Sequence, residues 1–133
     1  MTLEIMGKVI KREDGTGLVN FKMEIFVISQ MLFEEKVGEV VSKESGEFKT
    51  SIDDKGFFMK YGPDWGVYLV VYNANGVLIS NGRYDQQGRI IWSAKNLVMF
   101  DMTFPSNAVD KKPPKFDETF DEKAFFNDLK DIK

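Results

Sequence analysis

Any acid–base or nucleophilic chemistry in this chain would have to use carboxylates, lysines, tyrosines or hydroxyls. Its 133 residues include no histidine and no cysteine. The composition therefore excludes Ser-His-Asp and Cys-His nucleophiles, structural zinc sites and iron–sulfur clusters, as well as disulfide bonds. We expect no catalytic residue, no resident metal and no cofactor. A hydrolase that uses carboxylates without histidine or cysteine is kept as the weakest alternative.

One pair of carboxylates lies in a turn that Gly56 closes. Asp53 and Asp54 have the hard oxygen atoms that calcium prefers. The competing interpretation is an Asp-rich turn, in which the side chains bind nearby backbone amides. The chain has no D-x-[DN]-x-[DN]-G loop followed by glutamate, which is the pattern of a dedicated calcium loop. Weak calcium binding at this pair stays open.

Aromatic residues are the other chemical bias, with 12 Phe, 4 Tyr and 2 Trp. Segment 61–66, Tyr-Gly-Pro-Asp-Trp-Gly, joins two expected strands and places a tryptophan in a loop. Loop aromatics of this kind anchor protein partners or stack on sugars. Alternatively, the tryptophan folds back and caps the end of a sandwich. The candidate binding residues are Tyr61, Trp65 and Tyr68.

Charge and hydropathy narrow the choice of partners. The net charge is −3, and the basic residues are interspersed with acidic ones. We therefore expect no nucleic-acid partner, because backbone-driven binding needs a basic surface. No apolar run approaches the roughly 20 residues of a membrane span, and residues 1–10 lack the pattern of a signal peptide. We expect a cytoplasmic protein, with export by another route left open.

The spacing of glycines and apolar residues predicts an all-β fold. Turn signals divide residues 1–104 into short segments in which apolar and polar residues alternate. Asn75-Gly76 predicts a tight hairpin, segment 31–36 reads as a loop, and 67–72 reads as a central strand. We predict an antiparallel, immunoglobulin-like or prealbumin-like sandwich of seven to nine strands. The expected strands lie near 3–9, 21–28, 37–42, 46–52, 56–61, 67–72, 77–80, 90–94 and 98–104.

After residue 104 the composition changes. Prolines and lysines predict an extended linker over 105–118, and 119–133 predicts a short amphipathic helix. Thr119 and Glu122 form a capping-box pair at its start. Its apolar stripe is expected to dock either on the sandwich itself or on a partner. The residues expected to dock are Phe120, Phe125, Phe126, Leu129 and Ile132.

Residues 7–80 resemble the transthyretin-like, or carboxypeptidase regulatory-like, β-sandwich modules. Gly7-Lys8-Val9 is similar to their opening strand, 45–48 to their Gly-x-Phe segment, and 69–78 to their late hairpin. The resemblance covers a little over half of the chain, and it departs from the family at Lys43, where that family often has aspartate. It implies a prealbumin-like fold. The histidine-dependent enzymes of this fold class are not implied, because the chain has no histidine.

These observations favour a non-catalytic protein-interaction or structural accessory module. Its partner would be another protein or a second copy of the chain. The alternative is a carbohydrate-binding module that uses the loop aromatics to hold a glycan.

Overall fold

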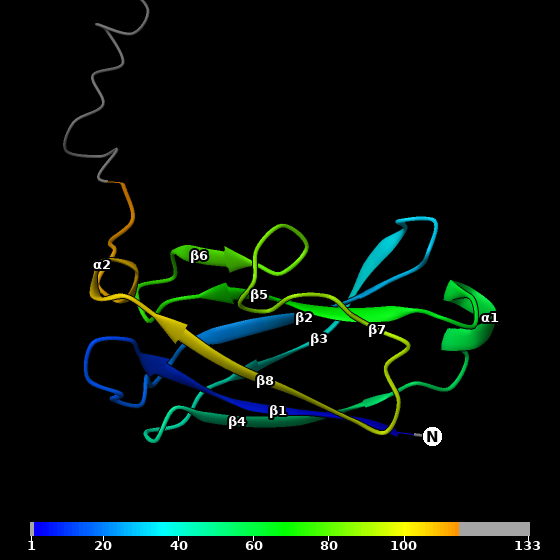
Figure 1. Ribbon diagram of the computed structural model, residues 1–133, viewed down its shortest axis with the longest axis horizontal. Coiled ribbons are helices and arrows are strands. Elements are labelled where there is room, and N and C mark those ends of the chain that lie inside the picture. Colours follow the sequence, from blue (N-terminus) through cyan, green and yellow to red (C-terminus); the bar gives the residue numbers. More distant parts are fainter. Residues whose placement is uncertain (1, 115–133) are drawn as a thin grey trace, which may run out of the picture.

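The chain folds into two β-sheets that pack face to face, and the computed structural model describes residues 2–114 (Figure 1). The smaller sheet has the order β4-β1-β8, and the larger has the order β3-β2-β5-β6, with β7 also paired to β5. The strands are β1 (Thr2–Lys11), β2 (Lys22–Ile28), β3 (Glu34–Val41), β4 (Glu47–Asp53), β5 (Gly66–Tyr72), β6 (Leu78–Asn81), β7 (Ile91–Trp92) and β8 (Leu97–Phe104). These eight strands in the described part confirm the all-β sandwich.

Alternation along the strands builds the core between the sheets. In β5, Val67, Leu69 and Val71 belong to the central core, whereas Tyr68 and Val70 belong to a second cluster. Because successive side chains of a strand point to opposite faces, these two sets lie on opposite faces of the larger sheet. β5 is buried along almost its whole length, and it pairs with β2 on one side and with β6 and β7 on the other. The prediction of a central strand over 67–72 is therefore confirmed.

Gly7 allows the smaller sheet to pack closely. It lies in β1, two residues from the fully buried Ile5 on one side and from Val9 on the other, so all three share one face. Its register partners are Phe48 on β4 and Phe100 on β8. A Cβ atom here would overlap the carbonyl oxygen of Phe100 and lie 2.8 Å from the Phe48 ring. The missing side chain makes room for the two aromatic neighbours.

One strand pairing differs from the expected antiparallel arrangement. β8 runs parallel to β1, with Gly7 opposite Phe100, while the other strand pairs are antiparallel. The chain leaves the larger sheet at Trp92 and enters the smaller sheet at Leu97, so residues 93–96 cross between sheets. Alternating hydrophobicity defines a strand's faces and not its direction, which is why the sequence pattern did not predict this pair.

The expected strand over 56–61 is wrong, because Phe57–Tyr61 forms the helix α1. Gly56 has φ 91°, a left-handed conformation that glycine adopts easily, and it turns the chain out of β4. The amide of Gly62 then donates to the carbonyl of Phe58 at 3.0 Å. Phe57 and Tyr61 are four residues apart and pack against the core from one side of α1, while Phe58 and Met59 are exposed. The apolar spacing is helical, although the segment is short.

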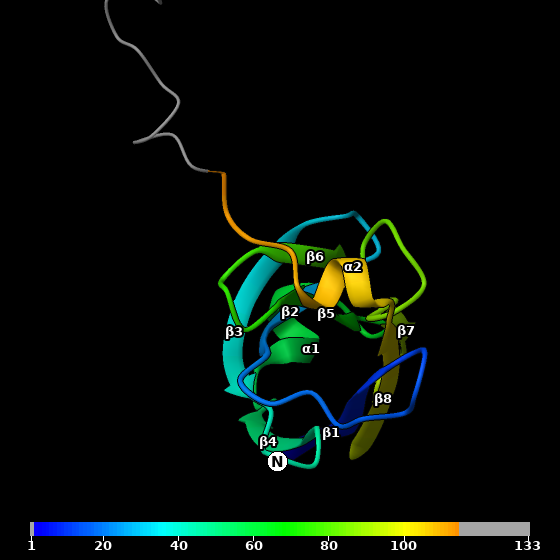
Figure 2. The ribbon, with the colours of Figure 1, turned by 90° about the vertical axis from the view of Figure 1, so that its left-hand side faces the viewer.

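The expected extended linker is also wrong at residues 106–109, where Ser106–Val109 forms the helix α2. The Asn73 side chain donates to the carbonyl oxygens of Ala108 at 3.0 Å and Lys111 at 2.8 Å. This segment therefore packs on the β5–β6 hairpin, at the opposite end of the sandwich from α1 (Figures 1 and 2). The expected helix over 119–133, with Phe120, Phe125, Phe126, Leu129 and Ile132, lies outside the described residues.

The β5–β6 hairpin confirms the turn predicted at Asn75-Gly76. Gly76 has φ 78°, and its amide donates to the carbonyl of Asn73 at 2.9 Å. Within residues 2–114, none of the helices has the length and apolar character needed to cross a membrane.

Candidate functional site

Several exposed apolar side chains lie at the end of the sandwich that carries α1. Two segments contribute them, the β2–β3 loop and the outer side of α1, which lie at the same end in Figure 1. We call this surface the apolar end. It consists of five residues that are between 53% and 89% exposed: Met31, Leu32, Phe33, Phe58 and Met59. Clustered exposed apolar side chains on a folded domain mark contact surfaces.

The β2–β3 loop holds its apolar residues outward in a tight, hydrogen-bonded turn. The Ser29 amide donates to the Phe33 carbonyl at 2.8 Å, and the Ser29 Oγ accepts the Phe33 amide at 3.1 Å. Leu32 has φ 66°, in the left-handed region where glycine and asparagine are favoured. An exposed leucine is a poor choice for such a turn on conformational grounds. Leu32 is therefore an exposed apolar residue in a conformation that its side chain disfavours.

A row of aromatic rings supports the apolar end from below. The Phe33 ring stacks on Tyr61 with centroids 6.2 Å apart. Phe57 meets both Tyr61 and Trp65 edge-on, at 5.3 Å and 5.2 Å. The ion pair between Lys60 Nζ and Glu35 Oε1, 2.7 Å long, ties α1 to β3 and holds the pKa of Glu35 below its usual value. The row joins exposed rings to the core and stiffens this end.

The structure brings together two of the three predicted binding residues and separates the third. Tyr61, Trp65 and Tyr68 are all buried, at most 7% exposed. Tyr61 and Trp65 both contact Phe57 at the apolar end. Tyr68 lies on the outer face of the larger sheet, where its ring stacks on Phe26 at 5.3 Å. The three rings therefore do not share one surface. The burial of Trp65 at this end agrees with the alternative interpretation, in which the tryptophan caps the end of the sandwich.

Tyr68 belongs to a polar cluster on that outer face. Its hydroxyl donates to the Glu34 carboxylate, and Arg83 Nη1 lies 2.8 Å from the same Glu34 oxygen. Arg83 comes from the connection between β6 and β7. Leu69 of β5 bonds to this connection at two points. Its amide donates to the Gly88 carbonyl at 3.0 Å, and its carbonyl accepts the Gly82 amide at 2.8 Å. Burial raises the pKa of the Tyr68 hydroxyl, and the bond to Glu34 raises it further. The cluster links the β6–β7 connection to β3 and β5 on the outer face of the larger sheet.

The shifted tyrosine gives an expected dependence of stability on alkaline pH. In the unfolded chain Tyr68 titrates near its ordinary value of 10.0, whereas in the folded chain it stays protonated to higher pH. Its contribution to the free energy of unfolding is therefore complete below pH 10 and is lost as the pH rises beyond it. We expect Tyr68→Phe to lose less stability than the wild type between pH 9 and pH 11, measured by urea unfolding.

The control for that measurement is Val70→Ala, which removes apolar contacts on the same face and no titratable group. It should lower the free energy of unfolding by a similar amount at both pH values. A Tyr68→Phe variant that loses stability as steeply as the wild type would show that this hydroxyl does not cause the alkaline loss.

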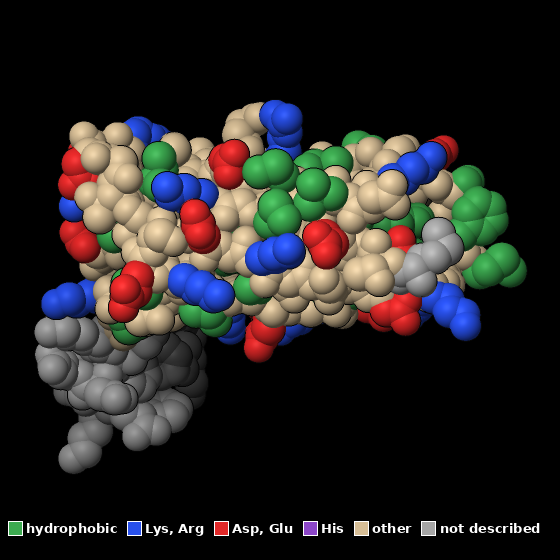
Figure 3. Space-filling model, turned by 90° about the horizontal axis from the view of Figure 1, so that it is seen from below, with side chains coloured by type: hydrophobic (Ala, Val, Ile, Leu, Met, Phe, Trp, Pro, Cys, Tyr) green, Lys and Arg blue, Asp and Glu red, His purple; other side chains and the backbone are tan. Residues whose placement is uncertain are grey.

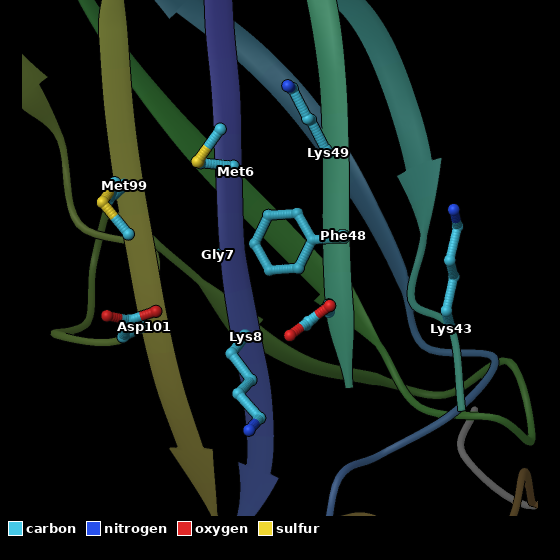
Figure 4. Close-up of a pocket in the computed structure, with 9 residues that line it drawn as sticks. Met6, Gly7, Lys8, Lys43, Phe48, Lys49, Met99 and Asp101 are labelled. Atoms are coloured by element: carbon cyan, nitrogen blue, oxygen red, sulfur yellow. The ribbon is translucent and has the colours of Figure 1, made fainter. Parts of the chain in front are cut away.

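A shallow groove of about 470 Å³ lies on the outer face of the smaller sheet (Figure 4). Met6 and Met99 form its apolar part. Lys8 lies between Glu47 on β4 and Asp101 on β8, its register partners, so the two carboxylates are separated by a cation. Figure 3 shows side chains of both charges interspersed over this side of the molecule. Such mixed charge is typical of a solvated sheet face.

The side chains of Asp53 and Asp54 differ in their hydrogen bonding. Asp53 Oδ1 accepts the Lys55 amide at 3.0 Å, as in the turn interpretation, whereas Asp54 Oδ1 is buried and has no hydrogen-bond partner among the described groups. Within residues 2–114, no set of three or more acidic, histidine or cysteine residues is grouped so that it could hold a metal ion.

The sequence analysis missed the residues that make the apolar end. Phe58 and Met59 were expected in a strand, and Met31 to Phe33 in a loop to which no binding role was assigned. The available signal was three consecutive apolar residues, Met31-Leu32-Phe33, inside a connection between two strands. Such a run outside any regular element cannot alternate into a core and is therefore exposed.

These features define a β-sandwich domain with a mixed three-stranded sheet and exposed apolar side chains at one end. No family model matches the chain, and no curated protein matches it. The resemblance to transthyretin-like modules thus stays a prediction.

Solved structures with similar folds include a 9R-lipoxygenase from Cyanothece PCC8801, with a TM-score of 0.46, 17% identity and 89% of this chain covered. An (S)-allantoin synthase and an alternative pilotin from the type II secretion system of Vibrio cholerae each have a TM-score of 0.44 over 77% of this chain, at 10% and 15% identity. The chain spans 20% of the lipoxygenase, 40% of the synthase and 96% of the pilotin. At these TM-scores, none of the three informs the function.

Proposed function

We propose that this chain is a non-catalytic protein-interaction or structural accessory module that binds a protein through the apolar end. The observation that carries the proposal is Leu32, an exposed apolar residue in a left-handed turn position that its side chain disfavours. Met31 and Met59 add flexible, polarisable side chains of the kind that adapt to a partner's surface. The polar residues Gln30, Glu35 and Lys60 lie beside this surface, and an apolar centre with a polar rim is the usual anatomy of a protein interface.

Leu32→Asn separates the two effects of this residue. Asparagine tolerates the left-handed conformation better than leucine, so we expect the free energy of unfolding to stay unchanged or to rise by up to about 1 kcal/mol. Partner binding or self-association should weaken, because the exposed apolar contact is lost. Thermal unfolding and sedimentation velocity measure the two results on the same sample.

The matched test replaces methionines of equal chemistry at two places. Met31→Gln together with Met59→Gln removes apolar side chains from the apolar end, while Met99→Gln changes a methionine that is 55% exposed on the outer face of the smaller sheet. We expect the double variant to weaken association about tenfold or more, which corresponds to about 1.4 kcal/mol, and Met99→Gln to leave it unchanged. Equal effects at both places would contradict a defined contact surface.

Docking by the C-terminal residues Phe120, Phe125, Phe126, Leu129 and Ile132 remains part of this proposal. Its test in the full chain is the double variant Phe125→Ser, Phe126→Ser, with association measured as above. Cytoplasmic location and the absence of a nucleic-acid partner also belong to the proposal, and the interspersed charge supports the second. The carbohydrate alternative is kept for Trp65, because this residue lines a cavity.

A further inference from the structure

The free edge of β8 carries backbone groups that can still accept another strand. β4 and β8 are the two edge strands of the smaller sheet, and they lie on opposite sides of β1 (Figure 2). β4 adjoins β3 of the larger sheet, whereas β8 pairs with β1 alone among the described strands. Unpaired amides and carbonyls on an edge strand are a template for pairing with another chain.

The hydrogen bonds at the end of β8 show which of its residues face away from β1. The Phe104 carbonyl accepts the Arg12 amide at 2.9 Å, so Phe104 faces β1. Successive residues of a strand direct their backbone groups to alternate sides, so the odd-numbered residues of β8 face away from β1. The Thr103 amide agrees with this direction, because it donates to the Gln87 side chain at 3.0 Å.

Met99 and Asp101 form the open part of this edge. The Thr103 amide at one end is already bonded, and at the other end the Leu97 amide donates to the Lys95 carbonyl at 2.6 Å. Between them, the amides and carbonyls of Met99 and Asp101 have no hydrogen-bond partner within residues 2–114. Charged side chains commonly protect such an edge, whereas Leu97 and Met99 are apolar and 48% and 55% exposed.

Two copies of this edge fit each other in one antiparallel register. Facing residues of a hydrogen-bonded pair exchange both of their N–H···O bonds. A twofold axis at Phe100 places Met99 of each copy opposite Asp101 of the other, so each open donor meets an open acceptor. With Met99 opposite Met99 instead, Asp101 would face Leu97, whose amide is already bonded. The open groups therefore select a second copy in a defined register.

The charges at this edge are compatible with that register. Asp101 lies opposite Lys8 of β1 in its own sheet, and it would face the neutral Met99 of the second copy. Like charges therefore do not face each other, which would be destabilising. The contact involves one short strand from each copy, so the dimer is weak and forms only at high concentration.

We propose that β8 pairs antiparallel with β8 of a second copy, Met99 opposite Asp101, and joins the two smaller sheets into one continuous sheet. The pairing goes beyond the proposed contact at the apolar end and does not use its residues. It follows the twofold symmetry that most homodimers have, in which both copies use the same surface.

The test measures pairing at the residues themselves, by amide hydrogen exchange of the full-length chain followed by NMR. We expect the Met99 and Asp101 amides to exchange at least threefold more slowly at about 1 mM than at about 50 μM, where a weak dimer dissociates. The Phe100 and Met102 amides face β1 and should exchange equally at both concentrations. Fast exchange at both would mean that the edge stays open, and slow exchange at both would mean that another segment of the same chain covers it. Either result would overturn the proposal.

Two opposite charges at position 99 test the register. Met99→Lys places a cation opposite Asp101 of the second copy and should tighten pairing about threefold, whereas Met99→Glu places like charges opposite each other and should weaken it about threefold. Met99→Gln adds no charge and keeps the backbone groups, so it should leave pairing unchanged. Equal effects of the lysine and glutamate substitutions would overturn the proposal. The double variant Met31→Gln, Met59→Gln should keep the slow exchange at β8, so this pairing and the contact at the apolar end can fail separately.

Discussion

Gly7→Ala is expected to destabilise the fold by about 3 kcal/mol or more. The new Cβ atom would overlap the Phe100 carbonyl oxygen and lie 2.6 Å from the Phe100 carbonyl carbon. Backbone of a paired strand cannot move aside as a side chain can, and overpacking of a well-packed core costs about 1–3 kcal/mol or more. Urea unfolding followed by circular dichroism measures the difference.

Gly38→Ala is the matched control, because Gly38 also lies within a strand and pairs with β2. There the nearest atom to an added Cβ is Ile52 Cδ1 at 2.6 Å, the end of a flexible side chain. A rotamer change relieves this contact, and alanine is preferred to glycine in a strand interior. We therefore expect a change of less than about 1 kcal/mol. Equal losses in the two variants would show that close packing at Gly7 is not specific.

Most strands were predictable because a strand that is buried on one face has apolar residues at every second position. In β8, Val98, Phe100 and Met102 are buried while Met99 and Asp101 are exposed, as alternation requires. The hairpin was predictable because Asn75-Gly76 supplies the left-handed conformation that the turn needs. Both signals are local, so no knowledge of the tertiary structure was required.

The helix α1 and the parallel pair β1–β8 depend on contacts that the local sequence does not encode. Five residues are too few to form a helix by propensity alone, and α1 is stabilised by the packing of Phe57 and Tyr61 against the core. Which strand β8 joins, and in which direction, is decided by the crossover 93–96, where Ser93 and Asn96 adopt positive φ values of 59° and 61°. Asparagine favours this conformation and serine does not, so the sequence marked only one of the two turns.

The candidate site was predicted in part. Segment 61–66 was singled out as a binding loop, with a tryptophan cap as the alternative, and its aromatic rings are buried and support other residues that are exposed. A tryptophan in a loop is compatible with a binding platform and with a cap, and only burial distinguishes them. The burial of Trp65 depends on the residue that packs against it. That residue is Phe57 of α1, a helix that the sequence did not predict.

Asn73→Ala is expected to lower the free energy of unfolding by about 3 kcal/mol, because one buried amide makes four hydrogen bonds. Its Oδ1 accepts the amides of Asn75 at 2.9 Å and Val77 at 3.0 Å, which closes the β5–β6 hairpin. Its Nδ2 donates to the carbonyls of Ala108 and Lys111. Alanine removes all four hydrogen bonds, at about 1 kcal/mol for each bond lost.

Asn73→Asp tells the two halves of this network apart. A carboxylate still accepts the Asn75 and Val77 amides, but it can no longer donate and places negative charge against two carbonyl oxygens. We expect it to keep slow hydrogen exchange at the Val77 amide and to lose it at the amides of Ala108 and Val109, whereas Asn73→Ala should lose protection at both. The same exchange in the two variants would mean that the hairpin and α2 form one inseparable unit. The expected result would instead show that a single side-chain amide anchors α2 and sets where the chain leaves the sandwich, and hence where the Phe-rich C-terminal residues begin.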